Sequence, residues 1–309
     1  MKCRRCREPA VIELRRHNAG FCRDCFFRHC GEQVRRAIDE FEMMQPGERV
    51  LVAVSGGKDS LGLWHLLRTL GYEADGLYVG LGIGEYSDTS GQYARAFAQE
   101  HGWKLLEVDL PDTYGFDVPD GSRAAKRTPC SACGLSKRHI FNQAAIDHGY
   151  ELLATGHNLD DEAAVLFGNV LRWETSYLGR QHPVLQAAPG FARKVKPLIR
   201  LGERELAAYC VLHGIDYIVE ECPMAAGNRH LGYKEALNAI EERSPGSKAA
   251  FVAGFFDRAH ARFAPDAVEE REELSPCVAC GAPTPGDVCA FCRLRTRAVG
   301  EPIPVRATP

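Results

Sequence analysis

Cysteine pairs separated by two residues are the most informative chemical feature of this sequence. Two such pairs lie near the N-terminus, two lie near the C-terminus, and one lies in the middle of the chain. Two CxxC motifs together offer four thiolates, which is a common ligand set of structural zinc. We therefore predict two zinc sites, formed by Cys3, Cys6, Cys22 and Cys25 and by Cys277, Cys280, Cys289 and Cys292.

The first set has neighbours that could replace one of its members. His29 or Cys30 could stand in for Cys25, although the double CxxC is the simpler arrangement. Modules this small bury too little apolar surface to fold alone, so we expect the metal to supply folding energy. The alternative is a set of reduced cysteines without a ligand.

The middle pair, Cys130 and Cys133, has no second pair beside it, so a distant residue has to complete its site. Cys210 lies on an apolar helical stripe, which is typical of a packed core cysteine. Cys222 follows the predicted strand 216–219, and ligands bind at the carboxyl ends of parallel strands, so we prefer Cys222. Three thiolates suit either an iron–sulfur cluster with an open position or catalytic cysteines that form a persulfide or transient disulfide.

The stretch SGGKDS has the composition of a phosphate-binding loop, and it follows the apolar run RVLVAV (49–54). Two glycines let the backbone approach a phosphate, and the amides of the following helical turn would face the anion. The pattern differs from G-x-x-x-x-G-K-[ST]. A tight turn before a capped helix is the alternative. The loop comprises Ser55, Gly56, Gly57, Lys58, Asp59 and Ser60.

The elements that must position these residues alternate between strands and helices. We predict strands at 49–54, 75–80, 104–110, 150–155, 194–199 and 216–219, with helices at 61–70, 90–101, 135–149, 159–172 and 203–213. This alternation predicts an α/β fold with a doubly wound parallel sheet. A chain of 309 residues is long for one core. We expect zinc modules at 1–32 and 271–309 around a catalytic domain at 33–270.

Composition and charge narrow the class of protein. Apolar residues make up 45% of the chain and charged residues 26%. We find no apolar run long enough to span a membrane, and the N-terminus does not have the apolar core of a signal peptide. We expect a cytoplasmic protein in which the cysteines stay reduced. The net charge of −3 argues against a general nucleic-acid binder. Residues 1–36, however, carry ten Lys or Arg and four acids, which is enough for a phosphate-binding patch.

The SGGKDS loop resembles the SGGxDS loop of the PP-loop ATP pyrophosphatases, and TGHNLDDEA (155–163) resembles their second motif. Taken with LGIGEYS, CSACGLSKR, EECP, YKEALN and the terminal CxxC pairs, the whole chain resembles the tRNA 2-thiouridine synthetases of the TtuA type. Without the resemblance, Asp160 and Asp161 would simply cap a helix N-terminus. That role stays our expectation for Asp160.

The resemblance implies ATP, Mg²⁺, a [4Fe-4S] cluster and two Zn²⁺ as cofactors. It places the cluster on Cys130, Cys133 and Cys222, and implies catalytic roles for these cysteines and for Asp59, Lys137 and Asp161. Asp161 would bind Mg²⁺ or assist proton transfer, and Lys137 would stabilise charge on the α-phosphate. The implied nucleotide contacts are Ala53, Val54, Ser55, Gly56, Gly57, Lys58, Asp59, Ser60, Val79, Lys137, Gly156 and Asp161.

The implied reaction adenylates the 2-carbonyl oxygen of a tRNA uridine and replaces this oxygen with sulfur. The resemblance is greatest to enzymes acting on uridine 54 of the T-loop, which receive sulfur from a ubiquitin-like carrier with a C-terminal thiocarboxylate. We also expect a homodimer. Basic residues of both terminal modules would hold the tRNA: Arg4, Arg5, Arg7, Arg15, Arg16, Arg293, Arg295 and Arg297.

The sequence leaves three alternatives open. Relatives that thiolate wobble uridine 34 share the architecture, and cytidine 32 is a further target in the superfamily. A PP-loop ligase or amidotransferase acting on a small carboxylic acid would need neither a cluster nor basic zinc modules. A non-catalytic zinc-ribbon binder of nucleic acid would have no use for SGGKDS or TGHNLDD.

Overall fold

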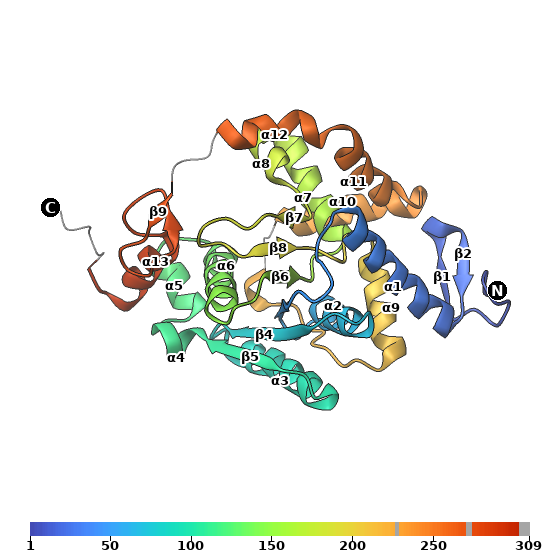
Figure 1. Ribbon diagram of the computed structural model, residues 1–309, viewed down its shortest axis with the longest axis horizontal. Helices are drawn as coiled ribbons and strands as arrows, with labels where there is room; N and C mark the ends of the chain where they lie inside the picture. The colour runs from blue at the N-terminus through green and yellow to red at the C-terminus, as the bar shows by residue number, and fades with distance from the viewer. Residues whose placement is uncertain (226–228, 270–273, 303–309) are drawn as a thin grey trace.

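A central sheet of six strands organises the molecule, as seen in the computed structural model, which describes residues 1–225, 229–269 and 274–302 (Figure 1). The strand order is β5-β4-β3-β6-β8-β7. β3 pairs in parallel with both β4 and β6, whereas β7 is antiparallel to β8. The bounds are β3 Val50–Val54, β4 Ala74–Gly80, β5 Leu105–Asp109, β6 Leu152–Thr155, β7 Val184–Leu185 and β8 Arg193–Val195.

The path of the chain through this sheet creates a switch point. The chain moves outward from β3 through β4 to β5, and then returns to place β6 on the other side of β3. The turns that leave β3 and β6 therefore meet at one edge, where such sheets bind ligands. The predicted doubly wound sheet is confirmed, with an antiparallel strand added at one edge.

Alternating side chains of β3 face two separate apolar layers. Val50, Val52 and Val54 pack into a core that α1, α2, α3, α7 and α9 share. Leu51 and Ala53 point to the opposite face, into a core formed with α5, α6 and α13. The bounds are α1 Arg23–Glu40, α2 Lys58–Thr69, α3 Gly84–His101, α4 Leu110–Tyr114, α5 Val118–Ala124, α6 Pro129–Asp147, α7 Leu159–Arg172, α9 Glu203–His213 and α13 Ala290–Val299.

Helices α7 and α9 have the predicted bounds, and α2 begins three residues before its predicted start. Helix α6 begins at Pro129 rather than at 135, because proline suits the first helical position. The predicted strand at 216–219 is wrong. This segment has no strand partner among the described residues, and it joins the sheet region through the Ile218 amide, which donates to the Gly56 carbonyl at 3.0 Å.

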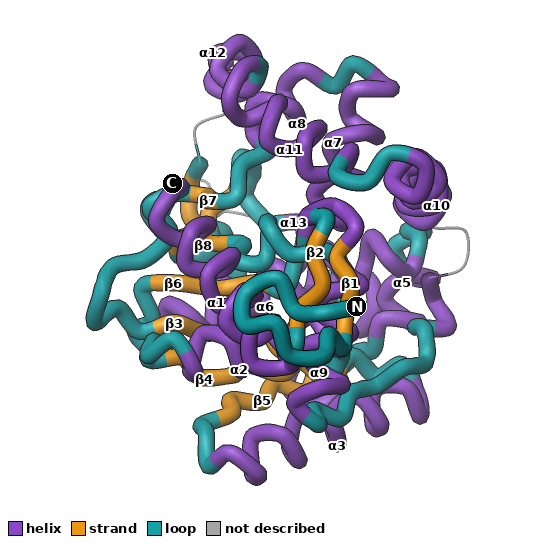
Figure 2. Tube along the Cα trace, turned by 90° about the vertical axis from the view of Figure 1, so that its right-hand side faces the viewer, coloured by secondary structure: helices purple, strands orange, loops and turns teal. Residues whose placement is uncertain are grey.

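Within the described residues, four helices that were not predicted from the sequence lie beyond α7. Helices α10 and α11 pack on α7, and α12 packs on α8. Figure 2 shows α11 and α12 at the top of the molecule and α3 at the bottom. The bounds are α8 Thr175–Arg180, α10 Arg229–Arg243, α11 Ser247–Arg258 and α12 His260–Glu269, and a 3-10 turn, η2, covers Pro223–Ala225.

The cysteine-rich termini form small modules at opposite ends of the molecule (Figure 1). The N-terminal module holds β1 (Ile12–Leu14), the 3-10 turn η1 (Arg15–His17) and β2 (Ala19–Phe21). The C-terminal module holds β9 (Ser275–Pro276), β10 (Pro283–Thr284) and the start of α13. The expected boundary at 32 lies inside α1, and the one at 270 lies outside the described residues. Within the described ranges, we find no helix that is long and apolar enough to cross a membrane.

Candidate nucleotide and cysteine site

The SGGKDS loop adopts the compact conformation expected of a phosphate-binding turn. Gly56 has φ +75°, and a Cβ at this position would lie 2.2 Å from the Ser90 carbonyl oxygen of α3, so only glycine fits. The Ser55 amide donates to Ser60 Oγ at 3.0 Å, which closes the loop. The N-cap of α2 is Gly57, whose lack of a side chain leaves the first helical amides accessible to an anion.

The turn after β6 packs directly on this loop. A Cβ on Gly156 would lie 3.0 Å from the Asp59 carbonyl carbon and from the Ser60 amide nitrogen. The Asn158 side chain then donates to Asp59 Oδ1 at 3.1 Å. The two motifs that are about a hundred residues apart in sequence therefore form one site at the switch point.

Five charged side chains form a network beside the loop. Lys58 Nζ lies 3.0 Å from Asp59 and 2.9 Å from Glu203. Lys234 Nζ lies 2.7 Å from Asp161 and 3.6 Å from Glu203. Neither Glu203 nor Lys234 was predicted as a site residue from the sequence. Lys234 belongs to the YKEALN motif that contributed to the resemblance, but nothing in the sequence indicated its partner.

The network shifts the pKa values of Asp59 and Asp161 in opposite directions. Burial and the nearby Asp161 charge raise the pKa of Asp59 above its usual value, although Lys58 opposes them. Burial also acts on Asp161, but Lys234 and the Asn158 amide more than offset it and lower the pKa of that carboxyl. Asp161 is therefore the carboxylate better held in its charged form, as a Mg²⁺ ligand has to be.

Asn158, and not Asp160, caps α7. Its side chain accepts from the amides of Asp160 at 2.9 Å and Asp161 at 3.2 Å. Asp160 instead accepts from the Glu203 amide at 2.8 Å, at the start of α9, and pairs with Lys248. The expectation that Asp160 caps the helix 159–172 is therefore wrong, because its carboxylate is engaged by the start of α9 and by Lys248.

The predicted adenosine contacts lie at the carboxyl ends of β3 and β4. The side chains of Ala53, Val54 and Val79 are buried in the two cores. Any contact with a nucleotide would therefore come from their backbone.

Two of the predicted cluster cysteines, Cys130 and Cys133, lie on α6, and the third, Cys222, directly precedes the turn η2, which contacts α6. Cys130 and Cys133 lie in the first turns of α6, and the Cys130 thiol donates to the Met224 carbonyl at 3.4 Å. Cys133 and Cys222 pack against the same apolar core, as does Tyr86 of α3. Cys210, by contrast, is fully buried on the other side of the sheet, where its thiol donates to the Lys58 carbonyl at 3.4 Å.

Lys137 follows Cys133 by one turn on α6 and acts on it electrostatically. Burial raises the pKa of the Cys133 thiol, and the Lys137 charge opposes this rise. A cation at this position therefore favours the thiolate, which is the form that binds iron. The same helix thus presents two of the predicted cluster ligands and the predicted nucleotide-contacting lysine.

Both terminal cysteine sets fit a metal. In each set, the four sulfurs lie within 4.8 Å of one another: Cys3, Cys6, Cys22 and Cys25, and Cys277, Cys280, Cys289 and Cys292. Backbone amides support the second set, since the Cys289 amide donates to Cys277 Sγ at 3.2 Å. Among the described residues, Cys130, Cys133 and Cys222 do not form a group whose sulfurs all lie within 4.8 Å of one another, as ligands of a single ion would. A cluster of several irons needs thiolates that are farther apart.

The basic residues of the N-terminal module differ in how accessible they are to a bound tRNA. Arg16 is wrong as a tRNA contact: its guanidinium lies 2.6 Å from Glu205, and its side chain is 13% exposed. Arg5 lies 2.9 Å from Glu32. Arg4, Arg7 and Arg15 are exposed.

A cavity of about 920 Å³ opens beside Cys130. Basic and aromatic side chains line it, including Arg138, Arg172 and Arg229 together with Tyr177 and Tyr233. Tyr177 is 57% exposed. Planar rings suit stacking of bases and guanidinium groups suit phosphates, so the cavity has the chemistry of a nucleotide site.

Comparisons with known proteins agree with this geometry. Residues 2–27 match the 2-thiouridine synthetase TtuA N-terminal LIM domain, and residues 30–226 match the PP-loop domain. The chain is 51% identical to a tRNA-5-methyluridine(54) 2-sulfurtransferase of Thermus thermophilus, covering 95% of this chain and 91% of that protein. A relative of the same name from Pyrococcus horikoshii is 41% identical, with 95% and 93% covered.

A solved structure shares the architecture. The U34-tRNA thiolase NcsA from Methanococcus maripaludis, determined with its [4Fe-4S] cluster, superposes with a TM-score of 0.78. The two chains are 25% identical, and the match covers 95% of each. These matches confirm the resemblance found in the sequence. The chain belongs to the PP-loop family and, within it, to the TtuA-type tRNA 2-thiouridine synthetases.

Proposed function

We propose that this protein is an ATP-dependent tRNA sulfurtransferase that converts uridine 54, or its 5-methyl form, to the 2-thio derivative. The observation that carries the proposal is the meeting of two chemistries at one sheet edge. A phosphate loop with a carboxylate–lysine network lies at the switch point, and the helix that carries Cys130 and Cys133 contacts the turn that directly follows Cys222. The relatives that are 51%, 41% and 37% identical carry this function in their names.

The nucleotide half of the site would activate the uridine. The amides of Gly57 to Ser60 and the Lys58 charge hold the β- and γ-phosphates, which leave as pyrophosphate. Asp161 would hold Mg²⁺, and Lys137 would stabilise charge on the α-phosphate. The uridine 2-oxygen attacks the α-phosphorus and becomes bonded to AMP. The oxygen alone is a poor leaving group, but it can depart later as part of AMP.

The cysteine half would supply the sulfur. Cys130, Cys133 and Cys222 would hold the cluster, and Lys137 favours the thiolate form of Cys133. When bound, a [4Fe-4S] cluster with three protein ligands supplies an iron with an open position that can hold sulfide. Sulfide attacks the activated carbon C2, AMP leaves with the former oxygen, and 2-thiouridine results.

The cavity beside Cys130 is the place we assign to the target nucleotide. Tyr177 and Tyr233 would stack on the base, and Arg172 and Arg229 would hold adjoining phosphates. A uridine within a folded T-loop has to leave its stack to reach such a cavity. We infer that the exposed arginines of the terminal modules hold the rest of the tRNA through its phosphates.

The remaining components follow from the family and stay part of the proposal. They are Mg²⁺ at Asp161, one zinc in each terminal module, a ubiquitin-like carrier whose thiocarboxylate delivers the sulfur, a homodimer and a cytoplasmic location. Wobble uridine 34 is the second candidate target, because the structural relative with a TM-score of 0.78 is a U34-tRNA thiolase.

A comparison of two cysteine variants tests the proposal. Protein purified without oxygen would be assayed for iron, for AMP formation and for thiolated nucleosides located within the tRNA. We expect Cys222→Ala to lose iron and thiolation, and Cys210→Ala to keep both, because Cys210 is a core residue. An iron-free protein with full thiolation would exclude the cluster, and thiolation at position 34 would overturn the assignment to position 54.

A further inference from the structure

A group of possible metal ligands lies away from the nucleotide site, where the N-terminal module meets α9. It consists of His17 at the end of η1, His29 in α1 and Glu205 in the first turn of α9. One ligand atom from each residue lies within 4.8 Å of the other two. These residues belong to neither cysteine set, and the proposed reaction uses none of them.

The distances within this group suit a small cation better than hydrogen bonds. His29 Nε2 lies 3.5 Å from Glu205 Oε1, and His17 Nε2 lies 4.0 Å from the same oxygen. A hydrogen bond between nitrogen and oxygen spans about 2.7–3.2 Å. Tetrahedral zinc, with bonds of about 2.0–2.2 Å, spaces its nitrogen and oxygen ligands about 3.4 Å apart. Small inward movements of two imidazoles would complete that geometry.

The three atoms are also buried without a hydrogen-bond partner. Among the described residues, His17 Nε2, His29 Nε2 and Glu205 Oε1 make no hydrogen bond and are shielded from solvent. His29 and Glu205 are each 4% exposed. A buried polar atom without a partner is costly, and here three such atoms face one another.

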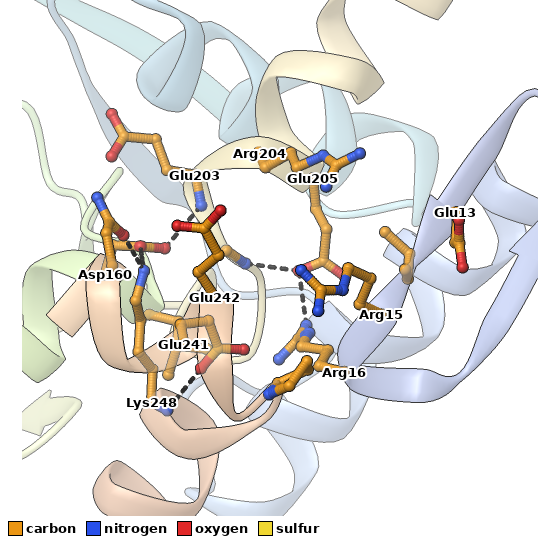
Figure 3. A pocket seen from close by; sticks show the side chains of 15 residues that line it. Glu13, Arg15, Arg16, Asp160, Glu203, Arg204, Glu205, Glu241, Glu242 and Lys248 are labelled. Atoms are coloured by element: carbon orange, nitrogen blue, oxygen red, sulfur yellow. Dashed lines mark hydrogen bonds and ion pairs between the residues drawn. The ribbon is translucent and has the colours of Figure 1, made fainter.

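The second oxygen of Glu205 is already held in place. Glu205 Oε2 accepts from the Arg16 guanidinium at 2.6 Å and from the Gly202 amide at 2.7 Å (Figure 3). An outer partner of this kind orients a metal-binding carboxylate and leaves its other oxygen for the ion. Arg16 thus has a structural task, which explains why its charge is withdrawn from solvent.

A cavity of about 510 Å³ borders the group at Glu205. Arg16 and Glu205 line this cavity together with Glu13, Glu241 and Glu242 (Figure 3). The cavity lining carries six carboxylates against four cations (Arg15, Arg16, Arg204 and Lys248), so its net charge remains negative and favours a cation.

We propose that His17, His29 and Glu205 bind a zinc ion, with water in the fourth position. Two imidazoles and one carboxylate are a ligand set that zinc uses in proteins. The ion would join the N-terminal module to α9, whose Glu203 pairs with Lys58 of the phosphate loop. The site thus fixes the position of a proposed tRNA-binding module relative to the nucleotide site.

Metal analysis of the full-length protein tests this site. Wild type, His17→Gln and His29→Gln would be equilibrated with Zn²⁺, and the bound zinc per chain would be measured after gel filtration. We expect each variant to hold one equivalent less than wild type. The matched control is His213→Gln, because His213 Nε2 is also buried without a partner but belongs to no ligand group among the described residues.

Cobalt distinguishes this site from the neighbouring cysteine set. Thiolate sites filled with Co²⁺ give a strong sulfur-to-metal charge-transfer band, whereas imidazole and carboxylate ligands do not. We expect the variants to lose one equivalent of Co²⁺ with this band unchanged. Equal metal content in wild type and both variants, or a band that falls together with the content, would overturn the proposal.

Discussion

Asp161 shows how the chemistry of one residue depends on partners that come from distant segments. It lies in the TGHNLDDEA motif, but its charge is stabilised by Lys234 of α10 at 2.7 Å. Burial alone would raise the pKa of this carboxyl, and Lys234 reverses the direction. The residue was recognisable from sequence, whereas the cation that sets its pKa was not.

Removal of this cation should therefore alter the pH dependence of catalysis. In Lys234→Met, the pKa of Asp161 rises, so the acidic limb of the rate of AMP formation should move to higher pH. A hydrogen bond to a charged group contributes about 1.5–3 kcal/mol, so we expect AMP formation to fall about 10- to 100-fold near that limb.

The Arg variant provides the control, because Lys234→Arg keeps the positive charge beside Asp161. A largely wild-type pH profile is expected for it. If Lys234→Met and wild type had the same profile, the assigned role of Lys234 would be wrong. The stabilisation that Asp161 gives the fold is present at neutral pH and is lost as the pH falls through its lowered pKa.

Cys210 and Cys222 show that the spacing of cysteines in the sequence cannot by itself identify the third ligand. Both lie downstream of the middle CxxC, and only their context separated them in the sequence. The structure buries Cys210 under α2 and leaves Cys222 partly exposed beside the start of α6. The choice of Cys222 as the third ligand remains a prediction, which the iron analysis above tests.

At the scale of elements, helix starts decide where the reactive groups lie. Helix α7 begins with a capping box, in which Asn158 accepts two amides and Asp161 accepts the Asn158 amide at 3.0 Å. The N-cap of α6 is Thr128, whose side chain makes no capping hydrogen bond. The N-terminus of α7 is therefore stabilised by side-chain hydrogen bonds, whereas that of α6 depends on Pro129 at the first helical position.

This difference predicts unequal effects of two alanine substitutions on stability. Asn158→Ala should lower the free energy of unfolding by about 1–2 kcal/mol, because it removes a cap and the bond to Asp59. Thr128→Ala should change it by less than about 0.5 kcal/mol. Urea unfolding of the two variants measures both values. Equal losses would show that Asn158 does not stabilise α7 in this way.

For the whole molecule, the two terminal modules define the largest dimension. The C-terminal module packs its Phe291 and Leu294 into the core that α5 and α6 share, and the N-terminal module joins α9 through Arg16 and Glu205. Each module thus extends one side of the catalytic domain. A tRNA held at both ends would be aligned across the site between them.

This arrangement predicts that exposed arginines act through phosphates rather than through bases. In Arg7→Gln/Arg15→Gln, tRNA affinity should fall, and the slope of log affinity against log salt should decrease by about 0.7–0.9 for each phosphate that the protein no longer neutralises. Filter binding over a range of salt concentrations measures the slope. Arg95→Gln is the control, because Arg95 lies on α3 and pairs with Glu107. An unchanged slope in the double variant would place the tRNA elsewhere.

The sequence by itself determined the doubly wound sheet, the phosphate loop and the two four-cysteine sets. These features depend on contacts between near neighbours: strands and helices show their periodicity, glycines mark a tight turn, and CxxC spacing places two sulfurs in one loop. The family resemblance then supplied the reaction and the cluster.

The tertiary structure alone decided which distant residues meet. It joined Lys234 to Asp161, assigned Asp160 to the start of α9, and left 216–219 without a strand partner among the described residues. It also withdrew Arg16 from solvent and set His17, His29 and Glu205 around one point. The physical reason is that side chains far apart in sequence acquire their burial, charge state and partners only when helices pack across the sheet.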